Sequence, residues 1–175
     1  MLSPRTTYCV LLAGAFAWCA GFVAAPLLSN VFGAEGSLTQ LSYEFYKPVC
    51  HQMDARSLHI VGQPFAVCSR CSAIYLSFLF AVIVFPLVRS IDNATMPSRF
   101  VLLLASLPML VDAVGATLGA HTATMETRLI TGSIFGFTLA FFIVPAILRG
   151  LDHSPEQSIP NHSFQKGFSS ARKTV

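Results

Sequence analysis

Four long apolar stretches alternate with polar segments along this chain. They cover residues 8–28, 66–88, 100–120 and 129–148. A helix needs about 20 predominantly apolar residues to cross a bilayer, so each stretch is predicted to be a membrane-spanning helix. The first stretch is longer than the apolar core of a signal peptide, which has about 7 to 15 residues, and we expect it to be retained as a helix.

The composition places the chain in the same class. Hydrophobic residues make up 54% of its 175 residues and charged residues only 11%, which is more apolar character than a soluble domain can bury. We therefore expect an all-α membrane protein with four transmembrane helices in one bundle over residues 1–150, followed by a disordered tail over residues 151–175. The net charge of +3 is dispersed, which argues against nucleic acid as a partner and leaves the lipid bilayer.

Two local features within the spans predict how the helices pack. Gly132 and Gly136 lie four residues apart in the fourth span, a spacing that allows a neighbouring helix to approach closely. Pro108 lies inside the third span and is expected to kink it. The spans are therefore predicted to pack through small residues in the fourth helix.

Positive charges are unevenly shared between the two sides of the predicted bundle. One side carries seven of the eleven Lys and Arg residues, namely Arg5, Arg89, Arg99, Arg149, Lys166, Arg172 and Lys173. The other side carries Lys47, Arg56, Arg70 and Arg128. Cytoplasmic flanks are enriched in Lys and Arg, so we predict a multi-pass protein of the cell membrane with both termini in the cytoplasm and an extracytoplasmic loop between the first two helices.

That loop, residues 29–63, is long enough to predict structure of its own. Ser37 and Gln40 match a capping box, which predicts a helix capped by Ser37. Its apolar residues recur at helical spacing, at Leu38, Leu41 and Phe45. Pro48 is expected to end this helix. The apolar face then lies either on the membrane interface or over the mouth of the bundle.

Cysteine and histidine gather around this loop. The spacing C-H-x16-C-x2-C contains three thiols and one imidazole, at Cys50, His51, Cys68 and Cys71. This is the ligand set of a tetrahedral site for zinc or another thiophilic metal. Adjacent side chains diverge in regular structure, so either an irregular turn brings Cys50 and His51 together or only one of them binds. His121 and His59 are reserve ligands.

Other interpretations of the cysteines stay open. Outside the cytoplasm thiols tend to be oxidised, so two of the three could form a structural or redox-active disulfide, or all could be inert. Cys68, Cys71 and Tyr75 share one face at the start of a helix, where backbone N–H groups stabilise a thiolate. Cys9 and Cys19 lie inside the first span and are expected to act as small hydrophobes without a functional role.

Charged residues near the spans are further candidates. Asp112 lies in the third span, roughly 13 Å below its outer end at a rise of about 1.5 Å per residue, where a carboxylate is costly without a partner. It is either a site residue or a neutral, hydrogen-bonded Asp. Arg128 is expected to reach Asp112 or to pair with Glu126. Arg70 either binds an anionic headgroup or extends to the interface.

These motifs together resemble an uncharacterised family of small prokaryotic membrane proteins, catalogued as domain of unknown function 2085. The resemblance covers roughly residues 40–140 and is carried by Cys50-His51-Gln52, Arg56-Ser57, Val67-Cys68-Ser69-Arg70-Cys71, Ile74-Tyr75, Arg128 and Thr131-Gly132. The chain has Ala73 and Ala113 where the family usually has Gly. The resemblance implies four spans and a shared polar site, but no activity. Its residues would be Cys50, His51, Gln52, Arg56, Cys68, Arg70, Cys71, Asp112 and Arg128.

Three classes of function follow from these candidates. The favoured class is a Cys/His metal site at the extracytoplasmic surface, either structural or supporting a reaction on a lipid-like or anionic substrate. In such a reaction Asp112 would act as acid or base, and Arg56, Arg70 or Arg128 would bind the anionic group. The second is a membrane thiol-disulfide oxidoreductase that uses Cys68 and Cys71 with Cys50. The third is a transporter or partner subunit, which would need a homo-oligomer.

Overall fold

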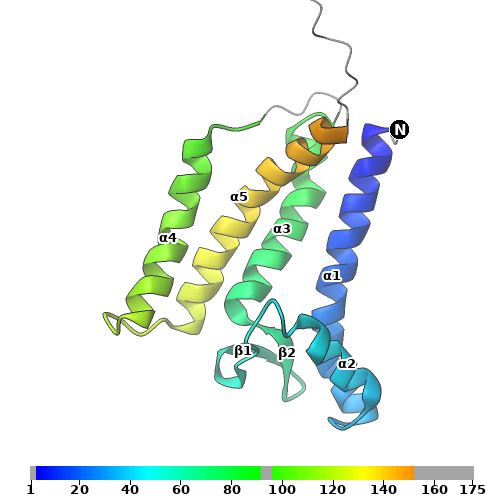
Figure 1. Cartoon of the computed structure of the whole chain (residues 1–175), viewed down its shortest axis with the longest axis vertical. Helices are drawn as coiled ribbons and strands as arrows, with labels where there is room; N and C mark the ends of the chain where they lie inside the picture. The colour runs from blue at the N-terminus through cyan, green and yellow to red at the C-terminus, as the bar shows by residue number, and fades with distance from the viewer. Residues whose placement is uncertain (1–2, 92–95, 152–175) are drawn as a thin grey trace, which may run out of the picture.

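Four long helices form most of the computed structural model, which describes residues 3–91 and 96–151 (Figure 1). Among these residues, four helices are long and apolar enough to cross a membrane. They are α1 (Pro4–Phe32), α3 (Ser69–Val88), α4 (Arg99–Thr117) and α5 (Met125–Leu151). Apart from Leu151, which ends α5, the tail predicted to be disordered lies outside the described residues.

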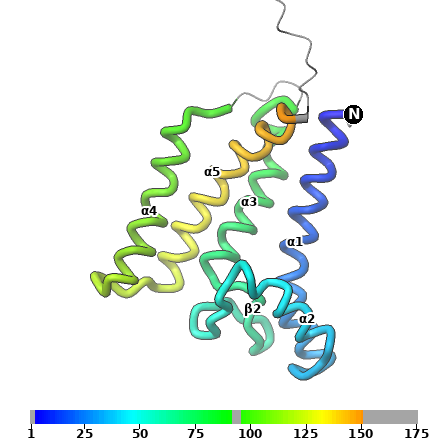
Figure 2. Tube along the Cα trace, viewed as in Figure 1, coloured from blue at the N-terminus to red at the C-terminus, as the bar shows by residue number. Residues whose placement is uncertain are grey.

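The helices stand side by side with α3 and α5 in the middle. The α3 and α5 helices share the most extensive contact, and α1 packs on α3 while α4 packs on α5. As a result α1 and α4 lie on opposite sides of the central pair (Figure 2). The start of α1 and the end of α5 lie at one end of the molecule, and the short elements between α1 and α3 lie at the other (Figure 1). We call this second end the loop end.

Glycines in α5 explain the closeness of the central pair. A Cβ atom on Gly132 would lie 2.8 Å from the carbonyl oxygen of Arg70, and one on Gly136 would collide with the carbonyl oxygen of Ile74. Backbones can approach this closely only where one helix carries no side chain. The close contact predicted for Gly132 and Gly136 is confirmed, and its partner is the first half of α3.

A two-stranded antiparallel sheet at the loop end corrects the all-α prediction. Strand β1 (Ser57–Ile60) pairs with β2 (Gln63–Cys68), and Ser57 stands opposite Cys68. The two residues between the strands, Val61 and Gly62, have φ of 51° and 76°, as tight hairpin turns require. Because residues 66–68 extend the second strand, the helix predicted from residue 66 begins at Ser69 instead.

The short helix α2 (Ser37–Tyr46) lies beside α1, and a single 3-10 turn (Asp54–Arg56) precedes β1. The N-terminus of α2 differs from the prediction. Gly36 is the N-cap of α2 and no side chain caps the helix, so the predicted capping box at Ser37 is wrong. The Tyr46 hydroxyl donates a hydrogen bond of 2.7 Å to the carbonyl oxygen of Trp18 and attaches the end of α2 to α1.

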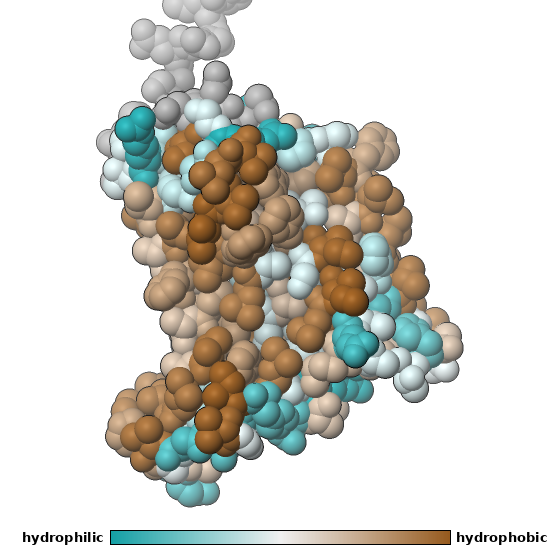
Figure 3. All heavy atoms as spheres, turned by 180° about the vertical axis from the view of Figure 1, so that it is seen from behind, coloured by the Kyte–Doolittle hydropathy of each residue, from teal (hydrophilic) through white to brown (hydrophobic). Residues whose placement is uncertain are grey.

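The other face of α2 is apolar and exposed. Leu38, Leu41 and Phe45 keep 53%, 66% and 60% of their surface accessible. Figure 3 shows hydrophobic residues over this part of the molecule, as it does over the sides of the long helices. An amphipathic helix at the end of a membrane bundle buries such a face at the headgroup level. Of the two positions predicted for this face, the exposure favours the membrane interface.

We predict that Gly136→Ala destabilises the protein by about 1–3 kcal/mol, because the new methyl group must push α3 away from α5. Equilibrium unfolding in mixed micelles measures the change. Gly14→Ala in α1 is the matched control, since nothing lies within 4 Å of the added atom. If both variants unfold at the same denaturant concentration, the close contact of α3 with α5 is not a source of stability.

Candidate functional site

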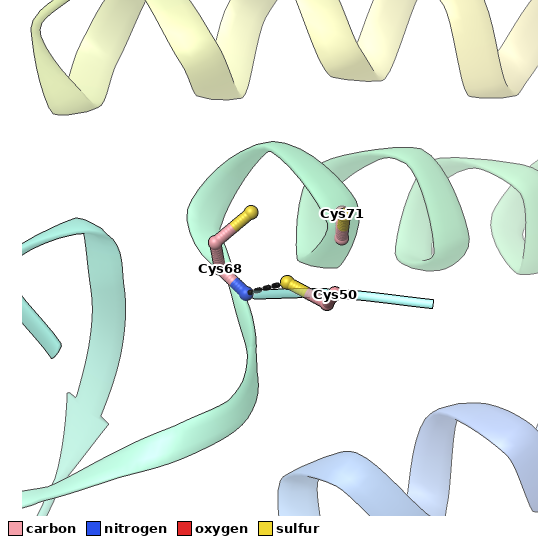
Figure 4. Close-up of side chains that lie close together, drawn as sticks. All are labelled: Cys50, Cys68 and Cys71. Carbon is pink, nitrogen blue, oxygen red and sulfur yellow. Dashed lines mark hydrogen bonds between the residues drawn. The ribbon is translucent and has the colours of Figure 1, made fainter. Parts of the chain in front are cut away.

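Three thiols meet at the loop end (Figure 4). The sulfur atoms of Cys50, Cys68 and Cys71 all lie within 4.8 Å of one another. Cys50 lies in the irregular segment after α2, Cys68 is both the last residue of β2 and the N-cap of α3, and Cys71 lies in the first turn of α3. The backbone N–H of Cys68 donates a hydrogen bond of 3.1 Å to the sulfur of Cys50. Residues 18 positions apart are thereby joined at the start of a helix.

Gln52 holds the irregular segment in place. Its backbone adopts φ 50°, which is uncommon outside glycine, and its side-chain amide donates to the carbonyl oxygens of Tyr43 at 2.6 Å and Ala66 at 2.7 Å. The Tyr43 hydroxyl in turn donates to the carbonyl oxygen of Pro64 at 2.6 Å. The end of α2 is thus tied to β2, which sets Cys50 against Cys68. The only sequence signal for this role is the position of Gln52 directly after Cys50 and His51.

The surroundings of Cys68 favour its thiolate. Donation by the Cys71 thiol, together with the backbone N–H groups of Cys71 and Arg70, lowers the pKa of Cys68 from 9.0 to about 5, although burial acts in the opposite direction. The exposed N–H groups of a helix start commonly stabilise a cysteine thiolate in this way. Cys68 is therefore ionised at neutral pH.

The spacing of the three sulfur atoms is suitable for binding a metal ion. Zinc binds sulfur at about 2.3 Å, which places neighbouring sulfurs about 3.8 Å apart in a tetrahedral site. All five cysteines are free thiols, so no disulfide holds the three together. His51 is exposed and does not belong to the group of thiols, and the reserve ligand His59 contacts Asp54 at 3.1 Å instead. The structure thus gathers three of the four predicted ligands.

The remaining cysteines lie apart from this group. Cys9 is exposed on α1. Cys19 is buried, and its thiol donates to the carbonyl oxygen of Tyr75 at 3.4 Å. Tyr75 packs beneath the thiols against the ring of Trp18, with ring centroids 5.7 Å apart. The three thiols and both rings therefore belong to one hydrophobic cluster at this end of the bundle.

A buried ion pair lies next to the thiols. The guanidinium of Arg70 donates to the carboxylate of Asp112 in α4, and the imidazole of His121 lies 3.3 Å from the other carboxylate oxygen. The side chain of Asp112 is 6% exposed and that of Arg70 is 23% exposed. Because α4 ends at Thr117, Asp112 is only about 7.5 Å from the end of its helix, nearer the surface than predicted.

This pair corrects the predicted partners. Arg70 holds Asp112, whereas the sequence suggested Arg128 for that contact and a headgroup or interface position for Arg70. Within the described part of the chain, Arg128 forms no ion pair with Asp112 or Glu126. Arg128 lines a pocket of about 460 Å³ together with Arg56 and His121. Arg128 thus lies near Arg56 and Arg70, and Arg70 alone among the three arginines contacts the carboxylate of Asp112.

Comparison with known proteins adds a family but no activity. The model of a family described as "Predicted membrane protein (DUF2085)" matches residues 50–142. An uncharacterized protein of Methanocaldococcus jannaschii, MJ1492, is 40% identical over 103 residues. That match covers 59% of this chain and 66% of the relative, so slightly less than two thirds of the relative's length is spanned. No solved structure matches the chain.

We predict that Asp112→Asn lowers the free energy of unfolding by about 3 kcal/mol, because it leaves the largely buried Arg70 guanidinium without its counter-charge. Unfolding in mixed micelles measures the loss. Asp54→Asn, which disrupts the exposed contact with His59, is the control and should cost less than about 1 kcal/mol. Equal effects of the two substitutions would show that the buried pair does not contribute to stability.

We also predict that Cys68 in chelator-treated protein reacts with iodoacetamide at a rate that rises through about pH 5 and levels off by neutral pH, because only the thiolate reacts. Mass spectrometry of the Cys68 peptide after short pulses gives the profile. Cys71→Ala removes the hydrogen-bond donor and should move the midpoint upward, whereas Cys71→Ser retains a donor and should move it less. A midpoint near the ordinary value of 9.0 in the unsubstituted protein would contradict the assignment.

Proposed function

This chain belongs to the DUF2085 family of predicted membrane proteins, and on that premise we propose that it holds a zinc ion between the thiols of Cys50, Cys68 and Cys71 at the extracytoplasmic membrane surface. The observation that carries the proposal is the convergence of three sulfurs within 4.8 Å from two separate segments. Three sulfur ligands with a lowered thiol pKa are typical of zinc and other thiophilic metals.

The first role of such an ion is structural. Cys50 belongs to the segment after α2, whereas Cys68 and Cys71 belong to the start of α3, so one ion would join the loop to the second span. The hydrogen bond from the Cys68 backbone to the Cys50 sulfur supports this role, since backbone donors orient and stabilise metal-bound thiolates. The fourth position is left to His51 or to water.

The second role is support of a reaction on an anionic or lipid-like substrate. A catalytic zinc has three protein ligands and one open position, where it activates water or polarises a substrate group. The three sulfurs would fill the protein positions. Asp112 would move a proton, and Arg56, Arg70 or Arg128 would hold the anionic group. The position of Arg70 between Cys68 and Cys71 at the start of α3, next to Asp112, supports this assignment.

The proposed location follows from charge. The described residues carry four Lys and Arg at each end, and the tail sequence that follows α5 adds Lys166, Arg172 and Lys173 to the side with the start of α1 and the end of α5. Cytoplasmic flanks are enriched in these residues, so both termini are assigned to the cytoplasm and the thiols to the exterior. The apolar exposed face of α2 would then lie on the outer surface of the bilayer.

A second candidate function, thiol-disulfide exchange, is favoured by the position of Cys68 as the N-cap of α3 with a pKa of about 5. The Cys68 thiolate would attack a substrate disulfide, form a mixed disulfide and release one substrate thiolate. Cys71 or Cys50, as a thiolate, would then attack the Cys68 sulfur and release the second thiolate. The substrate is reduced by two electrons, and the protein acquires one disulfide.

We predict that the purified chain contains one equivalent of zinc and that its three clustered thiols react with a thiol reagent only after chelation. Cys50→Ser, Cys68→Ser and Cys71→Ser should each lose the metal and lower the melting temperature. Cys9→Ser is the matched control, because Cys9 lies outside the group and should keep both the metal and the stability. Metal analysis, thiol counting and thermal denaturation of the four variants provide the test.

Two outcomes would contradict the metal proposal. Metal-free protein whose thiols appear only after addition of a reductant would instead indicate the second candidate. Unchanged melting temperatures for both Cys68→Ser and Cys71→Ser would rule out the structural role.

A further inference from the structure

Positive charge gathers around one pocket at the loop end. The guanidinium of Arg128 is close enough to those of Arg56 and Arg70 to interact with both electrostatically, and it also interacts with the carboxylate of Asp112. Arg70 is already paired with that carboxylate. Within the described residues, neither Arg56 nor Arg128 makes an ion pair. The pocket of about 460 Å³ lined by Arg56, Arg128 and His121 therefore has two guanidiniums that, among the described residues, no carboxylate contacts within ion-pair distance.

An unsatisfied donor belongs to a residue of the same pocket. The Nε of Arg128, which lines the pocket, is buried and makes no hydrogen bond within the described part of the protein. Buried polar groups normally have a partner, and one that lacks it within the protein indicates a ligand or ordered water. Guanidinium is the group that proteins use to bind phosphate, since its planar array of donors matches the phosphate oxygens. Charge and hydrogen bonding together favour a phosphate-type anion.

An apolar groove begins beside the arginines. It has a volume of about 740 Å³ and is lined mainly by α3 and α5, with Leu58 from β1 at its mouth. Both arginines of the pocket are followed closely by a residue of the groove, Leu58 after Arg56 and Leu129 after Arg128. The basic pocket and the groove therefore draw on neighbouring residues of two separate segments.

The length of the groove suits a lipid tail. Along α5 the lining extends from Leu129 to Thr138, about 13 Å at 1.5 Å per residue. One leaflet contributes about 15 Å to the hydrocarbon core of a bilayer. The lining is mostly apolar, with Phe80 and Phe137 at its deeper part. A tail in this groove would lie parallel to the spans, as the tails of surrounding lipids do.

We propose that this loop-end site binds a phosphorylated lipid, with its phosphate between Arg56 and Arg128 and one tail in the groove between α3 and α5. Arg70 remains paired with Asp112. The proposal does not depend on a metal at the thiols, because none of the thiols lines the pocket or the groove.

The test is a titration of the full chain in detergent, followed by native mass spectrometry. The probe is dioleoyl phosphatidic acid, and the comparisons are dioleoylglycerol, which lacks the phosphate, and inorganic phosphate, which lacks the tails. We expect Arg56→Gln and Arg128→Gln each to weaken phosphatidic acid about tenfold or more, the usual effect of losing a charge-assisted hydrogen bond. Lys47→Gln removes the same charge from the exposed end of α2 and should leave the affinity unchanged.

A substitution in the groove distinguishes binding of a lipid from binding of a free anion. Ser133→Phe fills the groove and should weaken phosphatidic acid while leaving inorganic phosphate unaffected. Thr138→Leu, deeper in the groove, replaces it if the first variant melts below the unsubstituted protein. The proposal is overturned if dioleoylglycerol binds as well as phosphatidic acid or if both arginine variants behave like Lys47→Gln. It is also overturned if inorganic phosphate binds as tightly as the lipid and the groove variants bind normally, because the site then holds a free anion.

Discussion

The contact between the first turn of α3 and the glycine face of α5 is the constraint on which the loop end of this protein depends. The carbonyl oxygen of Arg70 occupies the space that Gly132 leaves open. A contact this close sets the height of α3 and its rotation about its own axis. Since successive helix residues are turned by about 100°, the same rotation directs Cys71 toward the loop and Arg70 toward α4.

The ion pair that results is expensive in this environment. Removing a guanidinium and a carboxylate from water costs several kcal/mol for each, and their attraction offsets that cost only with good geometry and further hydrogen bonds. Here His121 contacts the second oxygen of Asp112, which completes the surroundings of the carboxylate. Ionisable residues inside membrane spans are rare, and those that are present usually belong to functional sites. The additional guanidiniums nearby strengthen that interpretation.

The thiols and the arginines share one structural origin. At Cys68 the strand β2 ends and the helix α3 begins, so Arg70 and Cys71 lie in the first turn of the helix. The free backbone N–H groups of this helix start stabilise the Cys68 thiolate. Gln52 then brings the loop close enough for Cys50 to join them. Metal binding uses several neighbouring thiolates, and thiol exchange uses an acidic thiol with a second thiol beside it, so the same local geometry underlies both candidate functions.

The sequence by itself determined the four spans, the small-residue contact in the fourth and the set of cysteines at one end, because these depend on hydropathy and on spacing along single elements. It did not reveal the hairpin, whose turn is Val61-Gly62 rather than a common Asn-Gly or Asp-Gly pair. Only the tertiary structure decided that Arg70 and not Arg128 holds Asp112. That contact joins residues 42 positions apart on α3 and α4, and it depends on the rotation that helix packing imposes, for which no local pattern carries a signal.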